Sequence, residues 1–384
     1  MKEKRPLAFE EYEADRIVNT HKHVDPWFWT KYSAHPYVGC RSGCAFCYSR
    51  GSRYLGSQAP EMFDKTIRVK ANAVGLLRKR LPALDRDVIS CGDWQQPAED
   101  RYRLSRGMLK VVCDLGFPLF IVERSPLLSR DSDLLQEIND RTWVAVAFSI
   151  SSLDRELKRS FEPYSPSVRA RLQTMEELAT AGLTVGTALM PIIPFVGDDE
   201  AHLEDVVHAT KDHGGSFVLG GGLTMDGVQA ERSLAAARGI DPQLESQWRH
   251  LYGWQNGGKP NYSPPSTYTA SLGLLIRALC ARHDLRDRLP RYIPPGPLGV
   301  NKRIAERLFL KTYELELEQA KGYRIWAYRK AAWAVDEHQE SVADTYTARG
   351  EAGLRELDGI GKSIGGHIAA WLQEMGAAHS PQPR

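Results

Sequence analysis

Apolar residues gather along the first two thirds of the chain in short continuous runs, many of them rich in β-branched side chains. Such runs are typical of strands buried on both faces of a parallel sheet. They cover 87–93, 118–124, 142–151, 183–192 and 216–223. Between them, apolar positions recur at helical spacing. The helical segments expected are 99–114, 132–139, 168–181 and 200–212. This alternation predicts a parallel sheet with helices over its faces.

A first strand is expected near Tyr37, which gives about six strand–helix units, fewer than the eight of a closed barrel. The sequence therefore predicts an α/β fold in the form of a partial barrel. Residues 1–35 form an N-terminal lead-in that precedes this pattern. Residues 226–266 are less regular and predict an insertion with a surface loop.

A stretch rich in proline and glycine at 290–302 predicts a domain boundary. Beyond it the pattern is helical, with no strand-like run. The expected domains are therefore the barrel at 36–290 and a small all-α domain at 291–384. A further helix is expected at 268–282, just before the boundary.

Hydropathy excludes a membrane-spanning chain, whereas net charge does not decide whether the protein binds nucleic acid. The 50 basic and 48 acidic residues give a net charge of +2, which neither demands nor excludes nucleic acid. No apolar run approaches the roughly 18 residues that a membrane-spanning helix needs. The N-terminal residues are polar and highly charged, unlike a secretory signal. We therefore expect a cytoplasmic protein that makes no membrane contact.

Three of the six cysteines, Cys40, Cys44 and Cys47, fall within eight residues, in the spacing C-x3-C-x2-C. Thiolates are soft ligands that suit iron–sulfur clusters. A cubane cluster takes four ligands, so three cysteines leave one iron open to an outside group. The alternative is a zinc site with His35 as fourth ligand, although structural zinc cysteines usually come in C-x2-C pairs. The scattered Cys113 and Cys280 lie among apolar residues and are expected to fill the core.

The cysteine run resembles the defining motif of the radical SAM superfamily, CxxxCxφC, in which Phe46 takes the aromatic position φ. The resemblance implies a partial (β/α)6 barrel that carries a [4Fe–4S] cluster on Cys40, Cys44 and Cys47. It also implies that S-adenosylmethionine (SAM) binds the open iron. One electron, from a donor such as flavodoxin or ferredoxin, then cleaves SAM to methionine and a 5′-deoxyadenosyl radical, which abstracts hydrogen from a substrate.

Further motifs over residues 15–225 are similar to the spore photoproduct lyase-like branch of that superfamily: PYVGCRSGCAFCYSR, CGDWQQPAEDRYRLSRG, VERSPLLSRD, AFSISSLDRELKRSFEPYSPSVRARL and MPIIP. By this resemblance the SAM contacts include residues beside the cysteines and at strand ends. They are Phe46, Tyr48, Gly92, Asp93, Arg124, Ser125 and Ser149. Glu162 and Arg171 would organise the loop and helix that follow. Each residue taken singly is also compatible with an ordinary polar strand end, but in barrels chemistry gathers at the C-terminal strand ends.

Cys91 is the candidate for a catalytic thiol and also a departure from the lyase pattern. Spore photoproduct lyase carries a hydrogen-donating cysteine in this strand, but the motifs place Ser90 at its position and Cys91 one residue later. Because adjacent strand residues point to opposite faces, the shift predicts that the Cys91 thiol points away from the site. Cys91 therefore stays a weak candidate, and the lyase's own substrate is in doubt.

The C-terminal run LDGIGKSIGGHI at 357–368 resembles a helix-hairpin-helix motif. Glycines in such a turn allow backbone N–H groups and a helix N-terminus to meet a phosphate. These contacts position a protein on duplex DNA without reading its sequence. The candidate nucleic-acid contacts are Gly359, Gly361, Lys362, Arg324, Arg329 and Lys330.

The wider stretch 300–375 resembles the N-terminal helical domain of family X DNA polymerases. In some of those enzymes a lysine of the second hairpin helix acts as a Schiff-base lyase. His367 occupies the matching position, so that activity is not carried over. From 296 to 384 there are 12 Lys or Arg and 12 Asp or Glu, so the module is not basic overall. It is therefore also compatible with docking on a protein or with merely packing on the barrel.

Together these patterns predict a radical SAM enzyme that acts on nucleic acid, most simply a lyase-like DNA repair enzyme. Two alternatives stay open. One is a radical SAM enzyme that modifies RNA, a protein or a small molecule, with the helical module recruiting a partner. The other is a metal-stabilised binding protein without catalysis.

Overall fold

The computed structural model describes residues 6–255 and 258–379, and its chain falls into two compact units. One unit comprises Met1–His21 and Thr30–Pro290, and the other comprises Lys22–Trp29 and Arg291–Arg384. The lead-in expected at 1–35 is thus shared between the two. The expected charged N-terminus at 1–5, the centre of the 226–266 loop at 256–257, and residues 380–384 lie outside the described residues.

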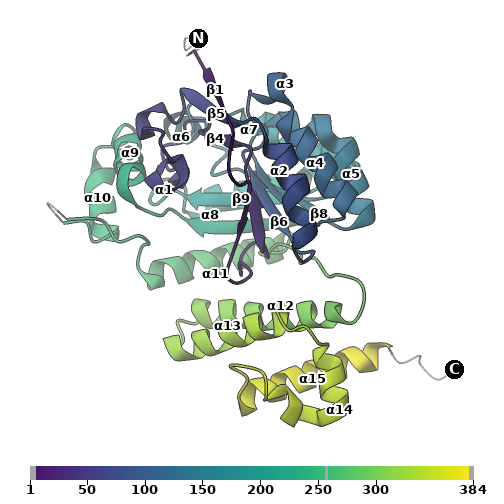
Figure 1. Cartoon of the computed structure of the whole chain (residues 1–384). Helices are drawn as coiled ribbons and strands as arrows, with labels where there is room; N and C mark the ends of the chain where they lie inside the picture. Colours follow the sequence, from purple (N-terminus) through teal and green to yellow (C-terminus); the bar gives the residue numbers. More distant parts are fainter. Residues whose placement is uncertain (1–5, 256–257, 380–384) are drawn as a thin grey trace. The chain divides into compact units, whose positions relative to one another are not determined.

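The first unit is built on a curved sheet with strand order β10-β9-β8-β7-β6-β3-β2 (Figure 1). The strands are β2 (Val18–Thr20), β3 (Tyr32–Ala34), β6 (Ile89–Gly92), β7 (Leu119–Glu123), β8 (Val144–Ser149), β9 (Thr184–Ile192) and β10 (Phe217–Gly222). All neighbouring pairs from β3 to β10 are parallel, and β2 pairs antiparallel with β3 at the edge. The described residues thus contain six parallel strands in one sheet, which confirms the expected α/β partial barrel.

The expectation of a first barrel strand near Tyr37 is wrong. Tyr37–Val38 forms β4, which pairs antiparallel with β5 (Thr66–Lys70) in a separate three-stranded sheet completed by β1 (Ala8–Tyr12). The first barrel strand is β3, a few residues earlier. It has only three residues, Tyr-Ser-Ala, so it produces no apolar run that sequence inspection detects.

The helices of this unit are α1 (Ser52–Leu55), α2 (Ala73–Arg80), α3 (Glu99–Tyr102), α4 (Leu104–Leu115), α5 (Ser132–Arg141), α6 (Arg155–Phe161), α7 (Val168–Thr180), α8 (Glu200–Asp212), α9 (Gly227–Arg238), α10 (Gln243–Leu251) and α11 (Ser266–Arg282), with short 3-10 turns η1 (Tyr48–Arg50), η2 (Pro60–Met62), η3 (Leu81–Ala83) and η4 (Pro126–Asp131). The helices that share the hydrophobic core on the outer face of the sheet are α2, α4, α5, α7, α8 and α11. Figure 1 shows α2, α4 and α5 side by side on this face. The single helix expected at 99–114 is instead two, because Arg103 adopts a left-handed φ of 49°. The insertion at 226–266 contains α9 and α10.

The two faces of the sheet carry different side chains. Cys91, Ile121, Val146 and Val185 are in register on neighbouring strands and belong to the hydrophobic core shared with the helices. Because side chains alternate along a strand, the preceding residues Ser90, Phe120 and Ala145 lie on the inner face of the barrel. Ser149, three positions after Val146, lies on the same face. Small and polar residues at the ends of these strands leave the inner face able to hold a ligand.

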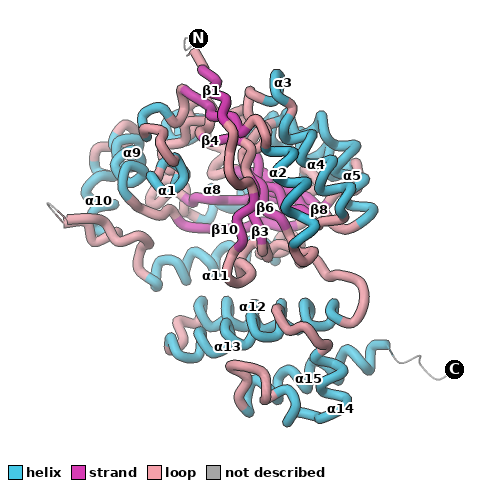
Figure 2. The backbone as a smooth tube through the Cα atoms, in the orientation of Figure 1, coloured by secondary structure: helices cyan, strands magenta, loops and turns pink. Residues whose placement is uncertain are grey.

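The second unit contains only helices and loops among its described residues, as Figure 2 shows. The helices are α12 (Leu298–Leu317), α13 (Gly322–Asp336), α14 (Val342–Leu354) and α15 (Lys362–His379). Segment Lys22–Trp29 belongs to this unit because Trp29, 2% exposed, lies 5.6 Å from Phe309, ring centroid to ring centroid. The indole of Trp333 also donates a hydrogen bond to the Val24 carbonyl at 3.0 Å.

Among the described residues, none of the helices has the length and apolar character required to cross a membrane.

Candidate active site

The three clustered cysteines lie on the loop between β4 and η1, and two glycines shape that loop. Gly39 has φ 92°, and a Cβ there would lie 2.6 Å from the Thr66 carbonyl oxygen, so only glycine fits against β5. Gly43 has φ 61° and packs against Tyr164. The backbone N–H of Cys40 donates to the Phe63 carbonyl at 2.8 Å. The loop is therefore held to the small sheet on one side.

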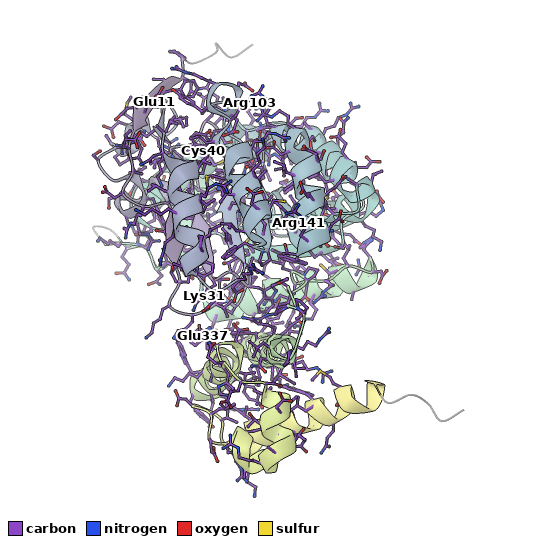
Figure 3. The ribbon with its side chains drawn as sticks, turned by 45° about the vertical axis from the view of Figure 1, so that its right-hand side comes forward. Glu11, Lys31, Cys40, Arg103, Arg141 and Glu337 are labelled. Carbon is purple, nitrogen blue, oxygen red and sulfur yellow. The ribbon has the colours of Figure 1, made fainter. Side chains whose placement is uncertain are left out.

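The other side of the cysteine loop contacts segments that follow the C-terminal ends of barrel strands. The N–H of Ala45 donates to the Phe161 carbonyl at 2.8 Å, and the N–H of Arg41 donates to the Gln96 side chain at 3.1 Å. In Figure 3, Cys40 lies toward the same end of the unit as Glu11 and Arg103, whereas Lys31, just before β3, lies toward the opposite end. The cysteines thus lie at the end of the barrel where the parallel strands finish.

Cys40, Cys44 and Cys47 are all free thiols, and the first two are buried. Burial raises the pKa of the Cys44 thiol to about 12, and the nearby Arg124 guanidinium opposes that rise. Among the described residues, no group of three or more His, Cys, Asp or Glu is placed to hold a single metal ion. Three unbridged soft donors on one loop are the ligand set that fits an iron–sulfur cubane.

His35, considered above as a fourth zinc ligand, has a different partner. Its Nδ1 lies 3.3 Å from the carbonyl oxygen of Gly92 at the end of β6. Burial lowers the pKa of His35, and Lys70 adds to that effect. The neutral imidazole is therefore favoured as a link between the ends of β3 and β6.

Asp93 and Gln96 follow β6 and reach the cysteine loop. Asp93 has a left-handed φ of 56°, which is costly for a residue with a side chain. After burial, its charge is the largest influence that raises the pKa of both Cys40 and Cys47, so its carboxylate lies near these thiols. The side-chain amide of Gln96 donates to the Asp93 carbonyl at 3.2 Å and to Sγ of Cys40 at 3.4 Å.

Arg124 follows β7 and lies beside the cysteine motif. Its guanidinium carbon is 5.8 Å from the centroid of the Phe46 ring. Its Nε is buried and makes no hydrogen bond, since the nearest charged oxygen of Glu162 is 3.9 Å away. An unsatisfied buried donor on a fixed cation fits a carboxylate ligand such as that of methionine.

Ser149, at the end of β8, is only 3% exposed, and its carbonyl oxygen accepts a 2.6 Å hydrogen bond from Arg171. Arg171 also pairs with Glu162, which accepts a hydrogen bond from Ser151 at 3.3 Å. Burial alone would raise the pKa of Glu162, but Arg171 and Arg124 outweigh burial and hold it below its usual range. Glu162 and Arg171 thus hold the segment after β8, as expected for organising residues.

Three other residues expected to contact SAM, namely Ser125, Tyr48 and Phe46, have partners within the protein or face solvent. Ser125 caps η4, because its hydroxyl oxygen accepts a hydrogen bond from Leu127 N–H at 3.3 Å. Tyr48 follows Cys47 but is 60% exposed, with its ring edge-on to Tyr54 at 5.4 Å. Phe46 is buried and stacks on Phe161 with ring centroids 6.3 Å apart. Phe46 therefore supports the loop, whereas Tyr48 presents a ring to solvent.

The weak candidate Cys91 points away from this site. It is 1% exposed, lies on the helix-facing side of β6, and its thiol donates to the Phe120 carbonyl at 3.5 Å. Burial raises the pKa of its thiol well above the usual value. The side chain of Ser90 lies on the opposite, inner face of the sheet, as the alternation along the strand predicts.

Sequence reasoning missed several residues at this site. Gln96 and Phe161 contact the cysteine loop directly, and Arg50 is 1% exposed with its guanidinium 4.6 Å from the Phe63 ring. Gln96 and Arg50 lie inside motifs already singled out, but polar side chains there resemble loop residues. Their burial depends on segments distant in the sequence, so local pattern does not reveal it.

In the helical unit, the hairpin turn contacts the second half of α13. Gly359 has φ 74°, and a Cβ there would lie 3.4 Å from Cβ of Lys330. Gly361 has open space around its α-carbon, and Lys362 is exposed at the start of α15. Lys330 and the hairpin glycines are thus brought together on one surface.

Arg324 and Arg329 differ in their surroundings. Arg324 is exposed in the first turn of α13. Arg329 forms an ion pair with Glu316 and lies over the Trp326 ring at 5.0 Å, so its charge is partly compensated. The same helix also presents two exposed aromatic side chains, Tyr323 and Trp326, which are 70% and 51% accessible.

Comparison with known proteins agrees with this geometry. Residues 35–207 match the model of the radical SAM superfamily, and residues 300–377 match the helix-hairpin-helix domain. The chain belongs to the radical SAM superfamily and is a radical SAM enzyme. Members of this family use a [4Fe–4S] cluster and SAM.

Among its relatives is an uncharacterized protein of Mycobacterium tuberculosis, 30% identical over 261 residues, which span 66% of this chain and 75% of the relative. Another, from Methanocaldococcus jannaschii, is 28% identical over 181 residues, spanning 47% of this chain and 66% of the relative. Among solved structures, a spore photoproduct lyase mutant with bound AdoMet and dinucleoside spore photoproduct aligns with a TM-score of 0.54. That alignment covers 72% of this chain and 79% of the lyase at 17% identity. The similarity is therefore one of fold.

Proposed function

We propose that this enzyme holds a [4Fe–4S] cluster on Cys40, Cys44 and Cys47 and acts on a lesion in DNA. The observation that carries the first part is the loop of three unbridged thiols at the C-terminal end of the barrel. When bound, the cluster supplies the electron that splits SAM into methionine and a 5′-deoxyadenosyl radical. A reductant such as flavodoxin or ferredoxin would deliver that electron.

The chain's own residues would hold SAM in place. The unsatisfied Nε of Arg124 provides a fixed positive charge for the methionine carboxylate. Ser149 ends β8, and Gly92 and Asp93 lie at the end of β6. These residues would provide polar contacts for the rest of the SAM molecule. Buried Phe46 and Phe161 exclude water from one side of the cysteine loop, which protects a reactive intermediate from side reactions.

Action on DNA is supported by the helix-hairpin-helix domain on the same chain. Gly359, Gly361 and the exposed start of α15 offer backbone N–H groups to a phosphate, and Lys362 and Lys330 add charge. Such contacts are independent of sequence, as a repair enzyme requires. The lyase-like motifs around the barrel make a damaged base the simplest substrate.

The test of the cluster is anaerobic reconstitution followed by iron and sulfide analysis and a 5′-deoxyadenosine assay with dithionite. Cys40→Ala, Cys44→Ala and Cys47→Ala are each expected to lose the cluster and the deoxyadenosine. Cys113→Ala and Cys280→Ala remove buried thiols that lie outside the loop, and they should retain both. Full cluster content in any of the first three variants would contradict this ligand assignment.

The test of the substrate is product analysis on ultraviolet-irradiated DNA, together with duplex binding at low salt. Truncation at residue 290 is a poor control, because it would remove Phe309 from buried Trp29. Point variants of the hairpin avoid that problem. SAM cleavage without binding to intact or damaged duplex would refute action on DNA and leave the radical chemistry standing.

A second candidate is modification of RNA, a protein or a small molecule, with the helical unit recruiting a partner. The balanced charge of this region, 12 basic and 12 acidic residues from 296 to 384, favours this alternative. Stimulation of deoxyadenosine formation by a substrate other than DNA would support it.

A further inference from the structure

The side chain of Gln96 reaches the sulfur of Cys40, one of the three clustered cysteines. It is 4% exposed and lies in the loop after β6. Its Nε2 is 3.4 Å from Sγ of Cys40 and 3.2 Å from the carbonyl oxygen of Asp93. Its Oε1 is 3.1 Å from the backbone nitrogen of Arg41. One amide therefore contacts the cysteine loop at two adjacent residues.

The chemistry of the three partners fixes which way the Gln96 amide points. A backbone N–H only donates, so the atom facing Arg41 must be the amide oxygen. The Asp93 carbonyl only accepts, so the atom facing it must be the amide nitrogen. Both requirements agree, and they direct an N–H group at the Cys40 sulfur.

The backbone around Gln96 is held by buried polar contacts. The neighbouring Gln95 donates from its backbone N–H to Glu123 at 3.1 Å and from its side chain to Asp131 at 2.9 Å. The carbonyl of Gln96 itself accepts from Glu99 N–H at 2.9 Å. Rigid placement matters because a hydrogen bond that must be assembled on demand contributes less than one already in place.

We infer that Gln96 is a positioning residue that tunes the reduction potential of the cluster through an N–H···S bond to Cys40. The inference rests on the proposed cluster site. A hydrogen bond to a cluster sulfur stabilises the more negative, reduced state and so raises the potential. The amide would thus make the cluster easier to reduce.

Two substitutions separate this role from simple support of the loop. Gln96→Glu retains an acceptor for the Arg41 N–H but replaces the donor at the sulfur with a negative charge. Gln96→Leu removes both. A matched control is Gln58→Leu, because Gln58 also supports the loop region, donating at 2.8 Å to the Thr66 carbonyl and at 3.3 Å to the Met62 carbonyl.

The measurement is an anaerobic redox titration of the reconstituted full chain, followed by electron paramagnetic resonance. Both Gln96 variants should have a lower midpoint potential than wild type, with Gln96→Glu lowest, whereas Gln58→Leu should match wild type. At the wild-type midpoint, less than half of either Gln96 variant should be reduced. Unchanged potentials in both variants at full iron content would overturn the inference.

A second measurement needs no variant that folds or binds iron. Wild-type protein labelled with a heavy nitrogen isotope in glutamine side-chain amides should show a nitrogen coupling to the reduced cluster. No such coupling would also overturn the inference. If wild type holds no cluster at all, the proposed function fails instead, so the two failures are distinguishable.

Discussion

Arg171 on α7 reaches the carbonyl oxygen of Ser149 at the end of β8 while its other nitrogen pairs with the carboxylate of Glu162. The side chain of Arg171 is fully buried and that of Glu162 is 3% exposed. This pair therefore fixes the end of a barrel strand, the segment after it and the next helix as one piece. Its location beside Arg124 places a structural ion pair directly next to the SAM-binding residue we propose.

Replacing Arg171 with Met should strongly destabilise the fold. It would leave the Glu162 carboxylate buried without its main partner, and breaking a buried pair in this way costs about 3–5 kcal/mol. The free energy of unfolding, measured by denaturant titration, should fall by that amount. The matched control is Arg141→Met, since Arg141 pairs with Glu137 at a site where both side chains are about half exposed. Exposed pairs contribute about 0–1 kcal/mol, so a similar loss in both variants would contradict the assignment.

Cys91→Ala should leave SAM cleavage and substrate turnover unchanged, because its thiol lies in the helix-facing core. The informative partner is Ser90→Cys, which places a thiol on the inner face of the barrel. If a substrate radical forms there, Ser90→Cys should raise the yield of product that has regained hydrogen. Deuterium incorporation from solvent into that product is the measurement. Loss of turnover in Cys91→Ala at wild-type stability and cluster content would show that the register argument is wrong.

Lys362→Ala should weaken duplex binding equally for all sequences. A lysine on a phosphate contributes charge without reading bases, so the slope of log affinity against log salt should fall by about 1. Fluorescence anisotropy over a salt series measures both quantities. Lys79→Ala removes an exposed lysine from α2 in the barrel unit and should leave affinity and slope unchanged. Equal effects of the two substitutions would indicate only a nonspecific loss of charge.

The buried His35 should make the fold less stable in acid. Burial and the charge of Lys70 lower its pKa from the usual 6.5, while Asp93 and the Gly92 carbonyl oppose them. Below pH 6.5 the unfolded chain then binds a proton that the native state resists, so stability falls as pH falls through that range. Denaturant unfolding on either side of this value should show a larger acid loss for wild type than for His35→Gln. Gln retains a donor for the Gly92 carbonyl but does not titrate, and an equal acid loss in both proteins would exclude His35 as the cause.

Most strands of the barrel can be predicted from the sequence, because strands buried on both faces form continuous apolar runs. The runs at 118–124 and 142–151 contain β7 and β8 in full. The three-residue β3 cannot be predicted in this way, because its pairing with other strands, and not its composition, makes it a strand.

The cysteine loop can be predicted from the spacing of its cysteines. The role of Gln96 cannot, because Gln96 contacts that loop only after the end of β6 packs against it. Segment Lys22–Trp29 falls within the expected lead-in at 1–35. Its place in the helical unit does not follow from local sequence, because its partners Phe309 and Trp333 lie near the other end of the chain.

That segment also bears on how the protein is made. Trp29 leaves the ribosome early, but Phe309, against which it packs, is synthesised 280 residues later. At about 5–20 residues per second, the interval is on the order of tens of seconds. The barrel can begin to form during that interval. The helical unit cannot fold until its C-terminal segment, which begins at Arg291, has been synthesised. We therefore expect the helical unit to complete its folding only after the barrel has been translated. Trp29, although synthesised early, would be among the last residues to become buried.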